Sequence, residues 1–202
     1  IAERVGALKL GMPWEEGVGI VPLPEDNKIA AMRAYIDDAV AKGAQVLNPK
    51  GGSGNFSIMR PAVLYPVAPS MRIFHEEQFG PVVPIAAFDD VRTPVRYVED
   101  SDYGQQVSVF GGDADQIAAL IDPLVNQVCR VNVNSQCQRG PDVFPFTGRK
   151  DSAEGTLSVS DALRVFAIRT LVAARNEEVN RSLITRIVRE RKSKFLSTDF
   201  LF

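Results

Sequence analysis

Two carboxylates and one aromatic ring stand close together in the segment Glu76-Glu77-Gln78-Phe79-Gly80-Pro81. A carboxylate can accept hydrogen bonds from ribose hydroxyls, and an aromatic face can pack on a flat heterocycle. The apolar run from Val82 to Phe88 follows at once and predicts a buried strand. One interpretation is therefore a small-molecule rim beside a strand. The other is an exposed glutamate pair with Phe79 packed in a core, and residue chemistry alone favours it.

A second polar region, residues 132–155, shows no periodic pattern, although it is long and rich in glycine and proline. Long non-periodic loops inside compact domains are usually functional or disordered. Its thiol, Cys137, is a weak candidate nucleophile, because only Arg139 is near enough in sequence to lower its pKa and the one histidine, His75, is far away. We therefore predict that Cys137, like Cys129, is a packed or half-exposed bystander.

The composition excludes several classes of function. A net charge of −2 over 202 residues gives no basic field that would attract nucleic acid. Two cysteines and one histidine are too few for a structural zinc site or a disulfide framework, which suits a reducing compartment. No apolar run approaches the roughly 20 residues that span a bilayer, so we expect no transmembrane segment. The first residues have the pattern of a helix interior, so we expect Ile1 to be either a cut through a larger polypeptide or the start of a processed product.

The clearest helix is expected to begin at Pro24-Glu25-Asp26, because proline suits a first turn and acids suit its positive end. Gly43 should end this helix, and a strand should follow at 45–47. Helix followed by strand predicts an α/β fold with a parallel sheet. The glycine-rich segment 48–55 lacks a Gly-Lys-Ser/Thr ending and is therefore interpreted as a surface turn. The apolar stripe of the helix comprises Ile29, Met32, Ile36, Ala39 and Val40.

Shorter elements complete the expected order. Residues 60–66 predict a strand, and the prolines at its ends suggest the edge of a sheet. Thr93 and Asp113 are the predicted N-caps of two helices. Further strands are expected at 82–88, 106–110, 128–134 and 166–174, with a short helix at 157–163.

The tail, residues 176–202, combines an apolar stripe at helical spacing with a basic side. Such a segment can dock on a partner protein or on an anionic membrane surface, and a solvated helix with a frayed end is the equal alternative. The stripe comprises Val179, Leu183, Ile184, Ile187 and Val188, and the basic side comprises Arg181, Arg186, Arg189, Arg191, Lys192 and Lys194.

The segment from Glu76 to Pro81 resembles the E-E-x-F-G-P loop of the aldehyde dehydrogenase superfamily. The resemblance implies that Glu77 holds the nicotinamide-side ribose and that Phe79 positions the nicotinamide ring. The region that starts at Asn132 is similar to the family's V-N-x-N … P-F-G-G-x-K-x-S-G segment, although a threonine replaces the first glycine of the pair. The resemblance covers nearly the whole chain to about Ala174, against the C-terminal portion of the family.

Within that superfamily, the string S-Q-C-Q-R-G-P-D-x-F-P-F at 135–146 resembles that of NADP-dependent non-phosphorylating glyceraldehyde-3-phosphate dehydrogenases. The resemblance implies that Arg139 holds the substrate phosphate, for which a guanidinium offers a planar fork of donors. The equal alternative is that Arg139 only donates hydrogen bonds to carbonyl groups of the loop and so holds the loop together.

The family's catalytic thiol lies in a G-Q-x-C segment and its general base in E-L-G-G, and neither string occurs here. We therefore predict no catalytic residue in this chain, which alone would be inactive. Residues 1–165 are expected to be the C-terminal part of a catalytic domain with a parallel α/β sheet, 166–175 an oligomerisation strand and 176–202 a basic tail.

Two functions remain open. The chain is either the C-terminal part of a non-phosphorylating glyceraldehyde-3-phosphate dehydrogenase, which oxidises an aldehyde to an acid through a thioester, or an inactive structural subunit derived from an aldehyde dehydrogenase within a larger assembly. NADP, or NAD, is expected to bind only if an N-terminal half is supplied, which could be a separate chain. Other copies or other subunits would bind through 166–175 and 176–202, since an unpaired apolar strand edge invites aggregation. The expected location is the cytoplasm, with a mitochondrion or other organelle as the alternative.

Overall fold

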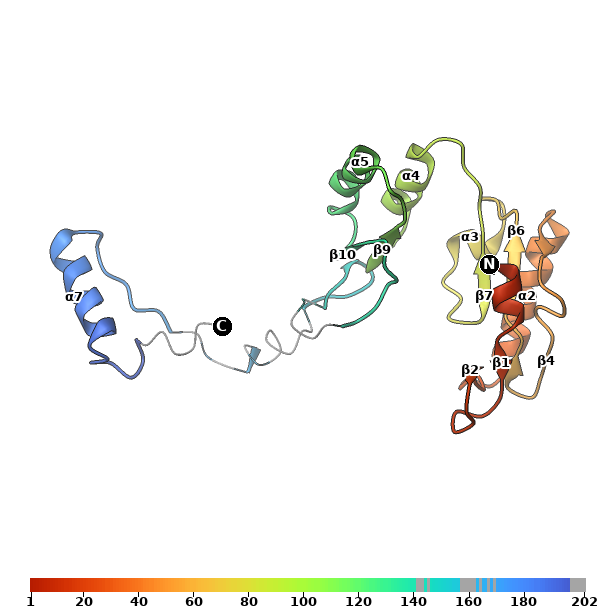
Figure 1. Cartoon of the computed structure of the whole chain (residues 1–202), viewed down its shortest axis with the longest axis horizontal. Coiled ribbons are helices and arrows are strands. Elements are labelled where there is room, and N and C mark those ends of the chain that lie inside the picture. Colours follow the sequence, from red (N-terminus) through yellow and green to blue (C-terminus); the bar gives the residue numbers. More distant parts are fainter. Residues whose placement is uncertain are drawn as a thin grey trace. The chain divides into compact units, whose positions relative to one another are not determined.

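The computed structural model describes residues 1–140, 144, 146–156, 163, 165–166, 168 and 170–196. The chain divides into two compact units, which are described separately (Figure 1). The first unit comprises Ile1–Gln138 and Thr147–Gly155, and the second comprises Arg139–Phe146 and Thr156–Phe202.

The elements of the first unit alternate between short strands and helices, which confirms the expected α/β class. Its helices are α1 (Ala2–Gly6), α2 (Lys28–Ala41), α3 (Arg72–His75), α4 (Arg92–Asp100) and α5 (Ala114–Leu124). Its strands are β1 (Lys9–Leu10), β2 (Val18–Ile20), β3 (Gln45–Val46), β4 (Gly54–Asn55), β5 (Ile58–Met59), β6 (Ala62–Tyr65), β7 (Val82–Pro84), β8 (Tyr103–Gly104), β9 (Gln106–Val109), β10 (Arg130–Val133) and β11 (Arg149–Lys150).

The largest sheet has the order β3-β6-β7, so β6 is its central strand. It pairs in parallel with β7 and antiparallel with β3. The predicted edge position of this strand is therefore wrong. Pro61 and Pro66 lie just outside β6, so neither removes a hydrogen-bond donor from the ladder. The first three side chains of β6, Ala62, Val63 and Leu64, are fully buried, as expected for a strand with partners on both edges.

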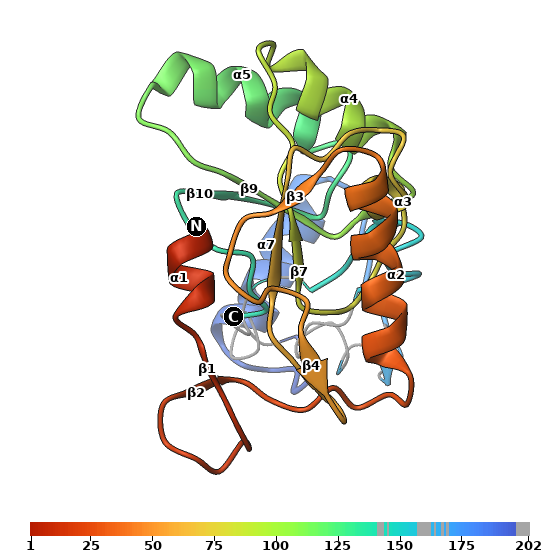
Figure 2. The same ribbon diagram turned by 90° about the vertical axis from the view of Figure 1, so that its right-hand side faces the viewer.

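Helix α2 lies beside the sheet that contains β3 and β7 (Figure 2). Its buried side chains, Ile29, Met32, Ile36 and Ala39, belong to one core with side chains of β6. Two details differ from the prediction. Val40 is 47% exposed, because it lies at the margin of the stripe. The helix begins at Lys28 rather than at Pro24, because the backbone of Asn27 is left-handed, with φ of 62°. Gly43 ends the helix region as predicted, with φ of 103°.

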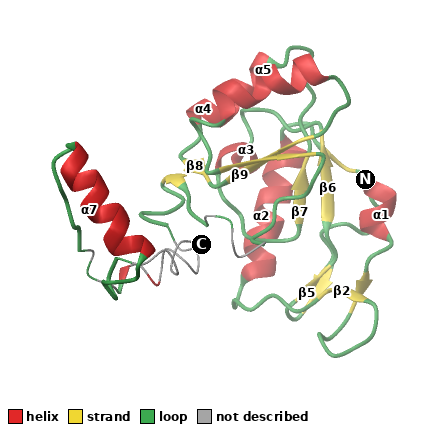
Figure 3. Ribbon diagram, turned by 60° about the vertical axis from the view of Figure 1, so that its left-hand side comes forward, coloured by secondary structure: helices red, strands yellow, loops and turns green. Residues whose placement is uncertain are grey.

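The strands β9 and β10 form a parallel pair, while α4 and α5 pack on each other (Figure 3). Asp113 caps α5 as predicted, since its carboxylate accepts a hydrogen bond from the backbone N–H of Gln116 at 2.9 Å. Thr93 does not cap α4, which begins one residue earlier. The carboxylate of Asp90 instead accepts from the backbone N–H of Arg92, also at 2.9 Å. The strand predicted at 82–88 is shorter than expected and ends at Pro84.

In the second unit, helix α7 (Glu178–Arg189) lies within the predicted basic tail. The predicted helix at 157–163 lies outside the described residues except for its last one. The described residues between 166 and 174 form no strand in the single chain. An oligomerisation strand there stays a prediction, because its pairing edge would come from another subunit. Within the described residues, no helix is both long and apolar enough to cross a membrane.

We expect Leu64→Ala to lower the free energy of unfolding by about 2–5 kcal/mol, because it leaves a cavity beside a fully buried central strand. Leu47→Ala is the matched control, since Leu47 is 44% exposed and should cost about 1 kcal/mol or less. Denaturant unfolding of each variant measures the difference. Equal losses would contradict the central position of β6.

Candidate functional site

The loop at 76–80 leaves α3 and leads into β7. The backbone of Glu76 is extended, so the helix stops there. The backbone of Phe79 is left-handed, with φ of 41°, which is uncommon for a residue with a side chain. A Cβ atom on Gly80 would overlap the Sδ atom of Met32, a fully buried residue of α2. The loop therefore approaches the core so closely at Gly80 that only glycine fits without movement.

Two side chains of this loop, those of Glu76 and Gln78, form hydrogen bonds with other residues of the protein. The Glu76 carboxylate accepts two hydrogen bonds from the guanidinium of Arg72, at 2.8 and 2.9 Å, and one from the hydroxyl of Tyr35 at 3.0 Å. The side chain of Gln78 accepts from the backbone N–H of Gly80 at 2.6 Å and donates to the carbonyl of Val82 at 3.2 Å. Both side chains hold the loop against its neighbours.

The residues between them, Glu77 and Phe79, project outward. Phe79 is 74% exposed, so it is not a core residue and the packing interpretation of the loop is wrong for it. Glu77 is exposed, and in the described part of the chain no group donates a hydrogen bond to its carboxylate. The carboxylate of Glu77 and the exposed ring of Phe79 therefore lie only two residues apart in the loop, and neither is used to hold it.

The charged side chains near Glu76 are paired with one another. The Arg72 guanidinium, and then the Tyr35 hydroxyl, hold the pKa of Glu76 below its usual range. The pKa of Asp38 is also lowered, first by Lys42 and then by the backbone N–H of Arg72, which donates to it at 2.9 Å. Burial and the neighbouring Glu76 raise the pKa of Tyr35. The carboxylates of Glu76 and Asp38 are therefore ionised and paired at neutral pH, whereas the hydroxyl of Tyr35 stays protonated and donates its hydrogen bond.

Glu77 and Phe79 line a cavity of about 650 Å³ within the first unit. Its described lining contains carboxylates, amides and hydroxyls but neither lysine nor arginine. Such a lining suits neutral hydroxyl groups better than phosphate, because it contains no lysine or arginine to balance phosphate charge. The other lining residues are His75, Glu76, Tyr97, Val98, Ser101, Tyr103, Gln105, Gln106, Val107, Val128, Cys137, Asp151 and Ser152.

The structure places Cys137 on the wall of this cavity, which sequence spacing did not indicate. Its side chain is exposed, and its Sγ atom lies 3.3 Å from the hydroxyl of Ser108 and 3.8 Å from the amide nitrogen of Asn132. Neither contact supplies a base or a cation that would favour a thiolate. The prediction that Cys137 is a bystander stays a prediction.

The V-N-x-N segment ties β10 to its neighbour. Asn132 is buried, and its amide donates to the side chain of Gln106 and to the carbonyl of Val107, both at 3.2 Å. The amide of Asn134 exchanges two hydrogen bonds of 2.9 Å with the backbone of Gly111. These asparagines therefore fix the parallel strands that carry part of the cavity wall.

Two residues that the sequence reasoning missed hold the segment 147–155 in the first unit. The ammonium of Lys150 donates to three carbonyls at the end of α4, at 2.7 to 2.9 Å, where a cation also balances the helix dipole. The hydroxyl of Ser152 accepts from the backbone N–H of Gly104 at 2.9 Å. The sequence feature that could have indicated them is the K-x-S spacing, because Lys150 and Ser152 both belong to the segment that resembles the family's P-F-G-G-x-K-x-S-G.

Arg139 belongs to the second unit, whereas Glu77 and Phe79 belong to the first. Its guanidinium is exposed and lies over the ring of Phe146, with the carbon of the guanidinium 5.2 Å from the ring centre. This cation–π contact restrains the guanidinium without using its N–H donors, which stay available to bind an anion.

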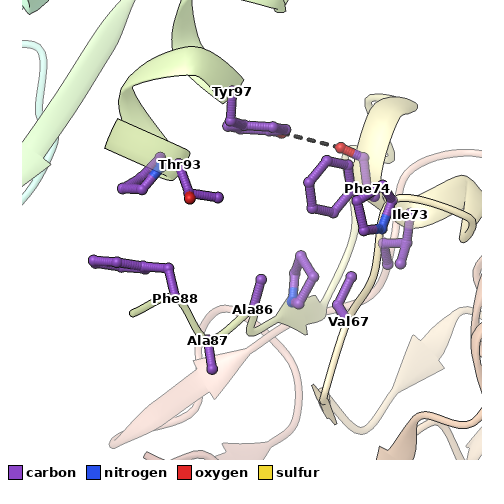
Figure 4. Close-up of a pocket in the computed structure, with 11 residues that line it drawn as sticks. Val67, Ile73, Phe74, Ala86, Ala87, Phe88, Thr93 and Tyr97 are labelled. Atoms are coloured by element: carbon purple, nitrogen blue, oxygen red, sulfur yellow. Dashed lines mark hydrogen bonds between the residues drawn. The ribbon is translucent and has the colours of Figure 1, made fainter. Parts of the chain in front are cut away.

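A second cavity of about 320 Å³ lies beside α3 and α4 (Figure 4). The hydroxyl of Tyr97 donates to the carbonyl of Phe74 at 3.1 Å, and the two rings meet edge to face at 4.9 Å. The lining is apolar apart from Thr93 and Tyr97 and contains no carboxylate, so it does not suit a ribose.

Among the described residues, no group of three or more His, Cys, Asp or Glu side chains could hold a metal ion.

Comparison with known proteins agrees with the loop and the fold. Residues 1–171 match the model of the aldehyde dehydrogenase family, and the chain belongs to this family. The resemblance seen in the sequence is thereby confirmed. Helix α7 lies outside the matched residues.

Several relatives are named NADP-dependent glyceraldehyde-3-phosphate dehydrogenase. The protein from Pisum sativum is 32% identical over 162 residues, which cover 80% of this chain and 32% of the relative. The protein from Streptococcus equinus is 33% identical over 159 residues, covering 79% and 32%. The chain thus spans about a third of the length of these relatives.

Solved structures show the same relationship. The NADP-dependent glyceraldehyde-3-phosphate dehydrogenase from Bacillus halodurans, complexed with NADP, is 36% identical, with a TM-score of 0.75 over 81% of this chain and 33% of that one. Aldehyde dehydrogenase 21 from Physcomitrella patens, in complex with succinate, is 26% identical, with a TM-score of 0.77 over 88% and 36%.

We expect the pKa of Glu76 to lie below its ordinary value of 4.5 and to rise in the variant Arg72→Met. Because the pKa is depressed in the folded state, the stability that Glu76 contributes is complete above its ordinary pKa of 4.5. That stability is lost as the pH falls through the lowered value. A carbon-13 NMR titration of the side-chain carboxyls measures both values.

The variant Arg92→Met is the matched control for this titration. Arg92 holds the pKa of Asp90 at about 2 through a similar exposed ion pair. Its removal should raise the pKa of Asp90 and leave that of Glu76 unchanged. A shift of Glu76 in this control would contradict a local cause.

Proposed function

We propose that this chain forms the nicotinamide-ribose side and the substrate rim of an NADP-dependent, non-phosphorylating glyceraldehyde-3-phosphate dehydrogenase. The observation that carries the proposal is the projection of Glu77 and Phe79 from a clamped E-E-x-F-G-P loop into one cavity. The relatives that bear this name, including the one complexed with NADP, support the choice of substrate and cofactor.

The described residues fit the ribose end of a nicotinamide nucleotide. The free Glu77 carboxylate can accept hydrogen bonds from the ribose hydroxyls, and the lining contains no lysine or arginine that would compete for it. The exposed Phe79 ring can pack on the nicotinamide and restrict its tilt. When bound, NADP supplies the hydride acceptor. The nucleophilic thiol and the general base are proposed to lie in polypeptide outside these residues, since the strings G-Q-x-C and E-L-G-G do not occur here.

Arg139 is the proposed ligand of the substrate phosphate. Its guanidinium lies over the ring of Phe146, and its planar fork of N–H donors matches the geometry of a phosphate group.

The alternative function is an inactive structural subunit derived from an aldehyde dehydrogenase. The absence of the thiol string from these 202 residues favours it. In either case we propose assembly with other copies or other subunits through 166–175 and the tail. We propose the cytoplasm as the location.

The variant Glu77→Gln should weaken NADPH binding by the native particle about tenfold, because a hydrogen bond to a charged group is worth about 1.5–3 kcal/mol. Titration of the nucleotide fluorescence measures the affinity, and Phe79→Ala should weaken it as well. The control Glu16→Gln removes an exposed carboxylate elsewhere and should have no effect. An unchanged affinity in Glu77→Gln would favour the structural alternative.

The variant Arg139→Met should raise the KM for glyceraldehyde 3-phosphate at least about tenfold, since it removes charge-assisted hydrogen bonds to the phosphate. The KM for unphosphorylated glyceraldehyde should stay the same, which separates phosphate recognition from a general defect. Arg186→Met removes an exposed arginine of α7 and serves as the control. If the KM rises equally for both substrates, Arg139 does not recognise the phosphate.

A further inference from the structure

One side of α2 faces the segment that leads to the E-E-x-F-G-P loop. Tyr35, Asp38 and Lys42 recur at helical spacing, so they lie on one side of the helix. The ammonium of Lys42 donates to the carbonyl of Ser70 at 2.7 Å and pairs with Asp38 at 2.7 Å. The Asp38 carboxylate then accepts from the backbone N–H of Arg72 at 2.9 Å. The start of α3 is thus bound to α2 through its backbone.

The side chain of Arg72 extends this attachment to the loop itself. Its guanidinium lies over the ring of Tyr35, 4.7 Å from the ring centre, and makes a bidentate ion pair with Glu76. The hydroxyl of Tyr35 donates to the same carboxylate at 3.0 Å. Ring, guanidinium and carboxylate therefore form one closed cluster, in which each member contacts the other two.

This cluster contributes little to global stability. The side chains of Arg72 and Glu76 are 46% and 45% exposed, and exposed ion pairs are weak contributors to folding. Its effect is local, because Glu76 directly precedes Glu77 in the chain. On the far side, Gln78 closes the loop against Gly80 and Val82. The side chains of the two projecting residues make no hydrogen bond or ion pair in the described chain, so the direction in which each leaves the chain depends on how the backbone of the loop is held.

We propose that Tyr35, Arg72 and Glu76 are positioning residues that set nucleotide affinity by fixing the direction in which Glu77 and Phe79 project. None of the three binds the nucleotide in this proposal, and the first glutamate of the E-E pair holds the loop while the second holds the ligand. The inference rests on the proposed role of Glu77. It adds that α2, far from the loop in sequence, determines how well this role is performed.

The experiment is NADPH titration of the native particle in four single variants and one double variant, with unfolding midpoints measured alongside. Arg72→Met removes the cluster centre. Arg72→Lys keeps the charge but loses the fork and the stacking plane. Arg92→Met breaks a comparable exposed pair elsewhere. Glu77→Gln, alone and combined with Arg72→Met, reports whether both act on one interaction.

We expect Arg72→Met to weaken NADPH binding about tenfold, because a misdirected Glu77 loses its charge-assisted hydrogen bonds to the ribose hydroxyls. The unfolding midpoint should stay close to that of the unsubstituted protein. Arg72→Lys should recover only part of the affinity, and Arg92→Met should leave it unchanged. In the Glu77→Gln background, Arg72→Met should cost markedly less than tenfold. Amide hydrogen exchange at Glu76 and Gly80 should accelerate in Arg72→Met alone.

Two different failures are distinguishable. If Glu77→Gln leaves the affinity unchanged, the proposed ribose contact is wrong. If Glu77→Gln weakens binding while Arg72→Met does not, the ribose contact stands and the positioning role is overturned. Full recovery in Arg72→Lys also overturns it, because charge rather than geometry would then be responsible. Additive losses in the double variant would show that Arg72 acts independently of Glu77, which contradicts the inference as well.

Discussion

The packing of α2 on the central strand β6 is the contact on which the first unit depends. One side of the helix contributes Met32 and Ala39 to a fully buried core with Leu64. The neighbouring side, which carries Tyr35 and Asp38, binds the segment before the candidate loop. A close-packed core resists displacement, so the polar side of the helix is a fixed reference for the loop.

The loop itself separates two tasks along alternate residues. Glu76 and Gln78 are engaged with the protein, whereas Glu77 and Phe79 are presented outward. The backbone is extended at Glu76 and left-handed at Phe79, and Gly80 then brings it against the core. The outcome is a loop with an unused carboxylate, in a cavity whose described lining contains neither lysine nor arginine.

Several other residues of the family motifs hold together the strands and helices around the cavity and do not offer reactive groups to it. Asn132 joins the parallel strands β9 and β10, and Lys150 holds the end of α4. Each satisfies backbone groups that would otherwise lack partners, which is costly away from water. The polar residues of these motifs therefore contribute geometry. The chemistry that the described first unit offers is concentrated in the two projecting residues of the loop.

The sequence by itself determined the α/β class, the apolar stripe of α2, the Asp113 cap and the identity of the loop that carries Glu77 and Phe79. These depend on local periodicity, capping chemistry and a short contiguous motif, all of which a linear sequence displays. Three features were decided only by the tertiary structure. Strand β6 is central because its flanking prolines fall just outside its ladder, Phe79 is exposed, and Glu76 binds Tyr35 of α2. Each depends on contacts between segments distant in the chain, where packing and burial outweigh local preference.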